Sequence, residues 1–260
     1  MNLLAGKKGV IIGVTNAMSL CYGIMQHALA HGAEIALTYP SEAVQRRVVP
    51  IAQEYGIERV YECNAASSDS IKAAFEGIGR DMGELDFIVH GIGFSDKEQL
   101  RGRYLDTTLD NFLNTMHVSC YSLVEILKSA EGLLKDGASV LTLTYHGARQ
   151  VVPNYNVMGV AKAALEASVR YLARDMGAGQ KAVRINAISA GPARTLASSA
   201  IQDFAAMLQL HKKASPLQRN ITLDDVAKSA MYLLSDMSSG VTGEIHYVDC
   251  GFSIVGHSAV

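Results

Sequence analysis

The segment YNVMGVAK, residues 155–162, separates a tyrosine from a lysine by seven positions, and only small or apolar residues lie between Asn156 and the lysine. Two turns of an α-helix take about seven residues, so Tyr155 and Lys162 would lie about 20° apart around the axis and about 10 Å apart along it. A helix here would present a phenolic proton donor and an ammonium ion on one face. Two residues alone are a weak motif, because an exposed tyrosine and lysine can share a helix face by chance.

The composition indicates a chain that buries a large core and has no excess of either charge. Of the 260 residues, 49% are hydrophobic and 18% are charged, and the formal net charge is −2. A chain of this length is long enough for one α/β domain, which we expect to span residues 1–260. The charge balance gives no electrostatic reason to expect nucleic acid or an anionic membrane as a partner. No apolar run approaches the ~18–20 residues that a membrane-spanning helix needs.

The N-terminus and the cysteines favour a cytoplasmic protein. The start MNLLAGKKGVIIGV resembles a signal peptide, but its apolar stretch VIIGV is too short, so we expect it to form a buried first strand. The four cysteines are far apart and form no CxxC pair, which favours free, mostly buried thiols in a reducing compartment. They are Cys21, Cys63, Cys120 and Cys250.

One pair of histidines has the spacing of metal ligands. His27 and His31 are four positions apart in a segment expected to be helical. A zinc-type site would also need a nearby glutamate and a third ligand, and neither is evident. We therefore expect a polar helix surface and no metal site.

Short β-branched runs alternate with longer helical segments along most of the chain. The predicted strands are 9–14, 34–39, 59–63, 85–93, 139–145, 184–191 and 244–251. The predicted helices are 20–31, 41–55, 67–81, 109–133, 155–176 and 222–235. Most of the strands are continuously apolar, as in a parallel sheet covered on both faces. The alternation predicts a Rossmann-like α/β fold, a three-layer doubly wound parallel sheet of about seven strands.

Residues 193–218 depart from this alternation, because they have helical propensity but no strand precedes the next helix. Ile201, Phe204 and Met207 belong to a row of apolar residues at helical spacing. Such a row usually packs into a core. Here it has no strand to pack under, so we expect a helical lid that contacts an acyl chain.

The turns after the first three predicted strands have features of a dinucleotide site. In GVTNAMSLCYG, residues 13–23, we expect Gly13 at the tight turn, Ser19 at the helix start and Gly23 where helix approaches strand. Amides and a hydroxyl at a helix N-terminus bind pyrophosphate, although an ordinary strand–helix turn would look similar. Beyond the second strand, Glu42 disfavours a 2′-phosphate while Arg46 and Arg47 would attract one, and we favour NADH over NADPH. Asn64, after the third strand, could bind adenine or cap helix 67–81.

The later strands bring further residues to the same edge of the sheet. Gly91 and Gly93 follow the fourth strand, where missing side chains allow a ribose or nicotinamide to approach the backbone. Tyr145 ends the fifth strand, and the sixth runs into a sharp turn at Gly191 and Thr195. The carboxyl ends of parallel strands form the ligand crevice in this fold class, so all these features meet at one site.

These motifs resemble the short-chain dehydrogenase/reductase superfamily and, within it, the NADH-dependent enoyl-acyl-carrier-protein reductases of bacteria. The similarity extends from about residue 3 to about residue 254, and PNYNVMGVAKAALEA with NAISAGPARTLA is its most specific part. The superfamily signature is Tyr-x-x-x-Lys, and the enoyl reductases keep the two residues farther apart, as this chain does. The resemblance implies a homotetramer that uses NADH to reduce trans-2-enoyl thioesters carried on acyl carrier protein, in fatty acid elongation.

The resemblance also assigns positions in this sequence. Tyr145, Tyr155 and Lys162 match the catalytic positions. Ser95 matches a position beside the substrate, where Tyr145, Tyr155 and the lid residues would also lie. The cofactor contacts matched are Gly13, Ser19, Leu20, Asn64, Ala65, Ile92, Lys162, Ala193 and Thr195, to which the strand-end glycines Gly93 and Gly191 are added. Three positions depart from the family pattern: Pro40 and Asn64 among the adenine contacts, and Gly91, which would slightly enlarge the pocket.

The roles of these residues follow from the chemistry of conjugate reduction. Hydride addition at C3 builds negative charge on the thioester oxygen, and we expect Tyr155 to donate a hydrogen bond to it. Lys162 would hold the nicotinamide ribose. Two roles are open for Tyr145, protonating the enolate or walling the pocket. The alternatives are a 3-ketoacyl-type short-chain reductase, for which Thr142 and Thr144 are the nearest hydroxyls, and an NAD(H)-binding sensor without turnover.

Overall fold

A seven-stranded parallel sheet forms the centre of the computed structural model, which describes residues 2–195 and 203–256. The strands are β1 (Lys8–Ile12), β2 (Glu34–Tyr39), β3 (Val60–Glu62), β4 (Leu85–His90), β5 (Leu134–Thr144), β6 (Arg184–Ala190) and β7 (Ile245–Val248). Their order across the sheet is β3-β2-β1-β4-β5-β6-β7, and every neighbouring pair is parallel. The predicted doubly wound α/β fold is confirmed.

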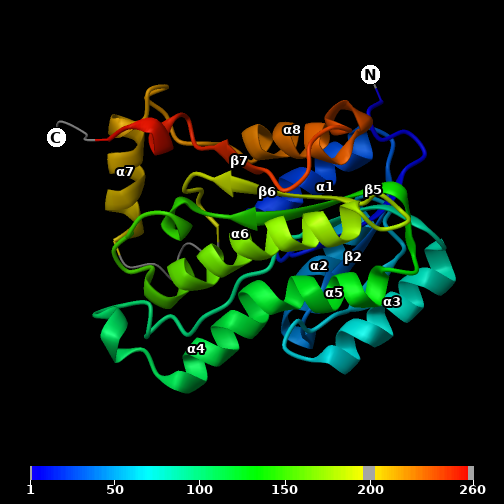
Figure 1. The fold of residues 1–260 in the computed structure, drawn as a ribbon, viewed down its shortest axis with the longest axis horizontal. Helices are drawn as coiled ribbons and strands as arrows, with labels where there is room; N and C mark the ends of the chain where they lie inside the picture. Colours follow the sequence, from blue (N-terminus) through cyan, green and yellow to red (C-terminus); the bar gives the residue numbers. More distant parts are fainter. Residues whose placement is uncertain (1, 196–202, 257–260) are drawn as a thin grey trace.

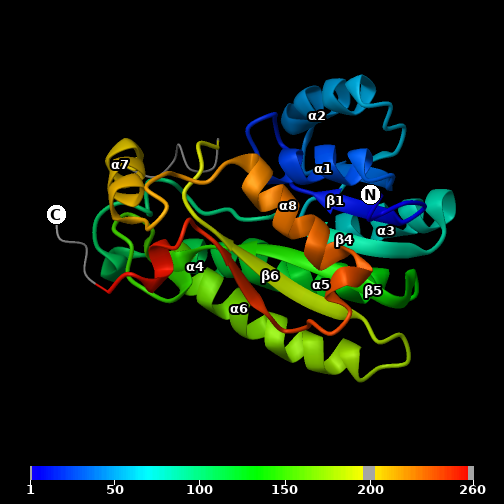
Figure 2. The same cartoon turned by 90° about the horizontal axis from the view of Figure 1, so that it is seen from above.

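Helices cover both faces of the sheet (Figures 1 and 2). On one face lie α1 (Leu20–Ala30), α2 (Glu42–Glu54) and α8 (Leu223–Leu234). On the other lie α3 (Ser68–Met82), α5 (Ser122–Ala130) and α6 (Asn156–Gly177). The two remaining α-helices of the described residues are α4 (Leu109–Met116) and α7 (Phe204–Ala214). No helix in the described ranges is long and apolar enough to cross a membrane.

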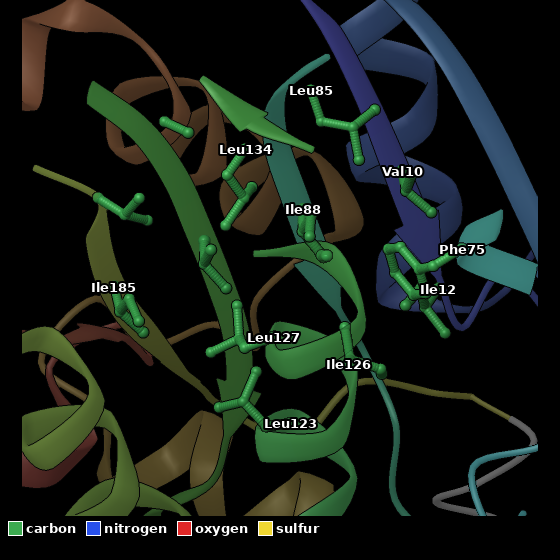
Figure 3. Packing of buried hydrophobic residues seen from close by; sticks show 14 of the residues in the cluster. Val10, Ile12, Phe75, Leu85, Ile88, Leu123, Ile126, Leu127, Leu134 and Ile185 are labelled. Carbon is green, nitrogen blue, oxygen red and sulfur yellow. The ribbon is translucent and has the colours of Figure 1, made fainter. Parts of the chain in front are cut away.

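The apolar strands divide their side chains between two cores, which is why both faces need helices. In β1, Val10 and Ile12 point into the core beneath α3 and α5, while Ile11 points into the core beneath α1 and α8. Figure 3 shows the first of these cores, where Phe75 of α3 and Leu123 of α5 pack over the strands. Strands buried on both faces read as continuous apolar runs, as the sequence did.

The order of the strands places a crevice at the carboxyl ends of β1 and β4. These two strands are neighbours, with Ile12 opposite His90, but the chain between them forms β2 and β3 on the other side. Such a switch in strand order leaves the two following turns diverging, and ligands bind in the space between them. Figure 1 shows α7 at the same end of the molecule, beyond the carboxyl ends of β5 and β6.

Three segments differ from the sequence predictions. The predicted helix 109–133 is interrupted, because a π-helical turn, η2 (His117–Tyr121), separates α4 from α5, and α5 ends at Ala130. Strand β5 begins at Leu134, earlier than predicted, with an irregular register beside β4. The described part of the predicted lid 193–218 has one helix, α7, and its earlier portion, 196–202, lies outside the described residues. The predicted capping box of α8, Thr222 with Asp225, is confirmed.

Candidate active site

A cavity of about 1080 Å³ opens at the carboxyl edge of the sheet. Its wall combines segments that follow β4, β5 and β6 with the starts of α1 and α6 and one face of α7. Residues predicted from sequence that line it are Leu20, Ile92, Gly93, Ser95, Tyr145, Tyr155, Lys162, Gly191, Ala193, Thr195, Phe204 and Met207. The structure therefore brings most of the predicted cofactor, substrate and catalytic positions to one cavity.

The two tyrosines of the site lie against each other. Tyr155 occupies the N-cap position of α6, and Tyr145 follows the last residue of β5. Their ring centroids are 5.0 Å apart with the ring planes at 73°, an edge-to-face contact. Tyr155 is only 9% exposed, and burial raises the pKa of its hydroxyl well above the ordinary value. That hydroxyl makes no hydrogen bond to any residue the structure describes, so it is a neutral donor available to a ligand.

Lys162 is a buried cation at the floor of the same cavity. Its side chain is buried, and its Nζ donates to the carbonyl oxygens of Ile92 at 3.2 Å and Leu143 at 2.9 Å. Burial disfavours the charged form and lowers the pKa of Lys162 to about 8. Across from it, a Cβ on Gly93 would lie 3.6 Å from Nζ. The ammonium group is thus held between the ends of β4 and β5 and is not an exposed surface charge.

The turn after β1 has the geometry of a dinucleotide cradle. Gly13 has a φ of +110°, and a Cβ there would lie 2.3 Å from the Gly91 carbonyl oxygen, so no larger residue fits. Ser19 is the N-cap of α1 and its Oγ accepts from the Tyr22 amide at 3.2 Å. Leu20 opens the helix and lines the cavity. A glycine turn leading into a helix N-terminus fits the pyrophosphate of NADH.

Two glycines of this region have different neighbours from those expected. Gly91 does not enlarge the pocket, because its missing Cβ would lie 2.0 Å from the Sγ of Cys21, whose buried side chain fills that space. The position of the missing Cβ of Gly23 faces α8 and not a strand. Gly23 allows α1 to pack against α8, where a Cβ would lie 2.9 Å from that of Leu223. Both partners come from distant parts of the chain.

The predicted adenine contacts lie apart from the main cavity. Asn64 and Ala65 follow β3 and are not part of the cavity wall. The Oδ1 of Asn64 accepts from the Ala66 amide at 3.0 Å in a local turn, and Ser67, not Asn64, caps α3. In α2, Arg46 forms an ion pair with Glu42 at 2.6 Å, which offsets the charge of one of the two arginines expected to attract a 2′-phosphate. The other, Arg47, is exposed.

Helix α7 contacts the site through the residues predicted for substrate. Phe204 and Met207 line the cavity, and the Tyr145 hydroxyl donates to the Met207 sulfur at 3.3 Å. Ile201, also predicted, lies outside the described residues. Farther along α7, the ring of His211 stacks on Phe252 at 3.6 Å between centroids, a contact that the sequence did not reveal.

Sequence reasoning also missed a buried carboxylate beside the tyrosines. Glu166 is 3% exposed on α6 and accepts from Thr144 Oγ1 at 3.0 Å and from Arg149 Nε at 3.1 Å. These two bonds fix both sides of the segment that carries Tyr145. The sequence pattern that could have predicted this site is a glutamate in the middle of an apolar helix face, one turn after Lys162. Helix α4 also contributes polar residues between Asp110 and Asn114 to the cavity wall, and no sequence pattern predicted them.

Comparison with known proteins decides the family. A family model described as enoyl-(acyl carrier protein) reductase matches residues 13–253. The chain belongs to the enoyl-acyl-carrier-protein reductase family. It is 56% identical over 256 residues to an enoyl-[acyl-carrier-protein] reductase [NADH] of Rickettsia typhi, covering 98% of this chain and 97% of the relative. The family resemblance drawn from the motifs is therefore confirmed.

Solved structures of the family superpose over nearly the whole chain. An enoyl-acyl-carrier-protein reductase from Anaplasma phagocytophilum in complex with NAD is 54% identical with a TM-score of 0.94, covering 99% of this chain and 98% of that one. A Bacillus cereus enoyl-acyl-carrier-protein reductase, solved with NADP⁺ and an indole naphthyridinone, is 40% identical with a TM-score of 0.95, covering 99% and 100%. The departures at Pro40, Asn64 and Gly91 thus occur within the fold of the family.

Proposed function

We propose that the protein reduces the C2–C3 double bond of trans-2-enoyl thioesters on acyl carrier protein with NADH, in fatty acid elongation. The observation that supports this best is the joint burial of Tyr155 and Lys162 in the wall of one cavity, beside a glycine turn that fits a dinucleotide. The names of relatives support the same activity, because the Rickettsia typhi protein is an NADH-dependent enoyl reductase.

The cofactor would be held by residues from three turns of the sheet edge. Gly13 and Ser19 would receive the pyrophosphate, and Gly93 would leave room beside Lys162 for the nicotinamide ribose. NADH, when bound, supplies the hydride for C3 of the substrate. The Glu42–Arg46 ion pair supports NADH over NADPH, because it leaves less positive charge for a 2′-phosphate.

The protein's own groups stabilise the charge that develops on the thioester oxygen. Tyr155 donates its hydroxyl, which burial keeps protonated, to that oxygen, and one such donor in a dry site contributes about 10²–10³ in rate. Lys162, charged at neutral pH, favours the enolate electrostatically and orients the ribose. The enolate then takes a proton at C2. Tyr145 shapes the pocket against Tyr155, and its hydroxyl, with a pKa raised by burial to about 12, is a protonated group near the substrate.

A ketoacyl-type reaction has less support from the same residues. That chemistry wants a free hydroxyl before the tyrosine, and both candidates are hydrogen-bonded elsewhere. Thr142 Oγ1 lies 2.8 Å from Nδ1 of buried His90, and Thr144 Oγ1 donates to Glu166. Thr144 and Tyr145 both line the cavity, but the Thr144 hydroxyl donates to Glu166.

Helix α7 is the substrate lid in this proposal, and its end would face the carrier protein. Phe204 and Met207 offer an apolar surface to the acyl chain, and a flexible methionine suits chains of different length. Lys212 and Lys213 are exposed at the end of the helix, where an acidic carrier could approach. Arg219 offers no such charge, because both its terminal nitrogens bond Asp225, at 2.6 and 2.9 Å.

The proposal includes a cytoplasmic homotetramer. All four cysteines are free and buried, as expected for a reducing compartment. Helices α4 and α6 contact each other and expose large apolar side chains, Leu109 and Leu113 from α4 and Tyr171 from α6. Apolar surface of this kind marks an association face. Sedimentation velocity should give a tetramer, and a monomer at micromolar concentration would contradict this part.

The deciding experiment measures NADH consumption with crotonyl and acetoacetyl thioesters in parallel, each repeated with NADPH. We expect turnover with the crotonyl thioester and NADH. Turnover only with the acetoacetyl thioester would favour the ketoacyl activity. Binding of NADH without turnover of either thioester would favour the sensor.

A further inference from the structure

A buried polar row on α4 and η2 faces the segment that follows β4. Its members are Asn111, Thr115 and Ser119, and each is less than one-tenth exposed. In an amphipathic helix this face would be apolar, so buried polar groups here must bond to something. Their partners are the backbone and side chains of residues 94–96, which form part of the cavity wall.

Ser119 makes the most complete of these contacts. Its Oγ accepts from the Phe94 amide at 3.0 Å and donates to the Phe94 carbonyl oxygen at 3.0 Å. One hydroxyl thereby satisfies both backbone groups of a residue that lies outside any strand or helix. A loop residue without such a partner would bond to water and vary in position. The Phe94 side chain, 55% exposed, lines the cavity.

The other two members hold the next residues of the same segment. Thr115 Oγ1 donates to Ser95 Oγ at 2.9 Å. The Asn111 carboxamide donates through Nδ2 to Ser95 Oγ at 3.2 Å and accepts from the Asp96 amide through Oδ1 at 3.1 Å. The three side chains of the row therefore hydrogen-bond to three consecutive residues of the cavity wall, Phe94 to Asp96.

The π-helical turn explains how Ser119 joins the row. In a regular α-helix each four-residue step rotates a side chain about 40° away from its predecessor, so a residue eight positions after Asn111 would lie about 80° off the face. A π turn contains more residues and reverses part of this rotation. The turn at His117–Tyr121 begins between Thr115 and Ser119 and returns the Ser119 hydroxyl to the wall.

We propose that Ser119 is a positioning residue for the enoyl thioester, which acts by fixing Phe94 and hence the wall between the nicotinamide end and the acyl end of the cavity. Ile92, on the cofactor side, is already fixed by the hydrogen bond that its carbonyl oxygen accepts from Lys162. Ser119 fixes the backbone of Phe94 on the substrate side in the same way. This inference rests on the proposed enoyl reductase activity.

Ser122 offers a matched control on the neighbouring turn. It is also a fully buried serine with two hydrogen bonds, one shared with His90 Nε2 at 2.9 Å and one donated to the Val118 carbonyl oxygen at 2.7 Å. Neither partner lines the cavity. Ser119→Ala and Ser122→Ala should therefore lower the melting temperature by similar amounts, while only the first loosens the wall.

The test compares both variants with the wild type in steady-state kinetics and in hydrogen exchange of the Phe94 amide. Loss of the two hydrogen bonds between Ser119 and the Phe94 backbone should raise the KM for crotonyl thioester about fivefold in Ser119→Ala. The kcat and the KM for NADH should change less than about twofold. Exchange at Phe94 should accelerate about tenfold in Ser119→Ala and remain unchanged in Ser122→Ala. Equal KM values in the two variants, or unchanged exchange at Phe94, would overturn the inference.

Two further outcomes remain decisive. If Ser119→Ala does not fold, Ser119→Cys keeps a similar side-chain size while weakening both hydrogen bonds to Phe94, and it should raise the same KM and accelerate the same exchange. A wild-type protein that binds NADH but does not reduce crotonyl thioester would refute the proposed function. In that case hydrogen exchange of the Phe94 amide would still decide whether Ser119 fixes the Phe94 backbone.

Discussion

Replacing Tyr155 by phenylalanine should separate catalysis from stability. The Tyr155 hydroxyl makes no hydrogen bond to any part of the chain that the structure describes, so its removal breaks no hydrogen bond among those residues. We expect the free energy of unfolding to change by less than about 0.5 kcal/mol, below the usual net worth of one hydrogen bond. The same hydroxyl is the proposed donor to the enolate oxygen. Its loss should lower kcat with crotonyl thioester by about 10²–10³, equivalent to about 2.7–4 kcal/mol of transition-state stabilisation.

The assay combines NADH oxidation, calorimetry of NADH binding and urea unfolding. NADH affinity should remain at the wild-type value, because Lys162 and the glycine turn are unchanged. Tyr171→Phe is the matched control, since Tyr171 lies on the same helix but is 74% exposed. A kcat within about threefold of the wild type would remove Tyr155 from the chemistry, and a large loss of stability would contradict the absence of a hydrogen-bond partner for its hydroxyl among the described residues.

Three other perturbations test the remaining parts of the site. Burial lowers the pKa of Lys162 to about 8, so NADH affinity should fall as the pH rises through 8 and the ammonium loses its proton. In Lys162→Met the NADH affinity should be weaker and independent of pH. Calorimetry showing wild-type NADH affinity in this variant would contradict the role. Gly91→Ala should destabilise the fold by about 1–3 kcal/mol, because the added methyl group collides with the Cys21 sulfur, and most of that cost should vanish when Cys21 is also replaced by alanine. If the two substitutions change the free energy of unfolding additively, residues 21 and 91 are not in contact. NADH with enoyl thioester should slow tryptic cleavage after Lys212 and Lys213 if α7 closes as a lid, whereas equal cleavage rates would argue against closure.

The residues proposed to carry the chemistry were recognisable from sequence because their types and positions are constrained locally. Tyr155 and Lys162 have the spacing of a helix face, and both line the cavity because that helix begins at the carboxyl edge of the sheet. Gly13 was recognisable because a sharp turn after a strand needs a positive φ. Parallel strands collect their carboxyl ends at one edge, which predicts a shared site without any knowledge of the loops.

Features that depend on tertiary contacts were not recognisable in the same way. Gly91 leaves room for Cys21, and Gly23 leaves room for α8, and neither partner is near in sequence. The π turn at His117–Tyr121 contains neither glycine nor proline, so nothing in its composition interrupts the helical pattern. The early start of β5 was missed because Leu134 is followed by the polar residues of KDG, which resemble a turn.

The neighbouring positions of β1 and β4 have a consequence for how the protein acquires its ability to bind a nucleotide. Ile12 and His90 are paired in the finished sheet, yet the whole stretch of chain that forms β2 and β3 lies between them in sequence. Closing so long a loop is slow, and the two halves of the crevice cannot meet until it is done. Acquisition of NADH affinity during refolding should therefore lag behind helix formation and report the docking of the two halves of the sheet.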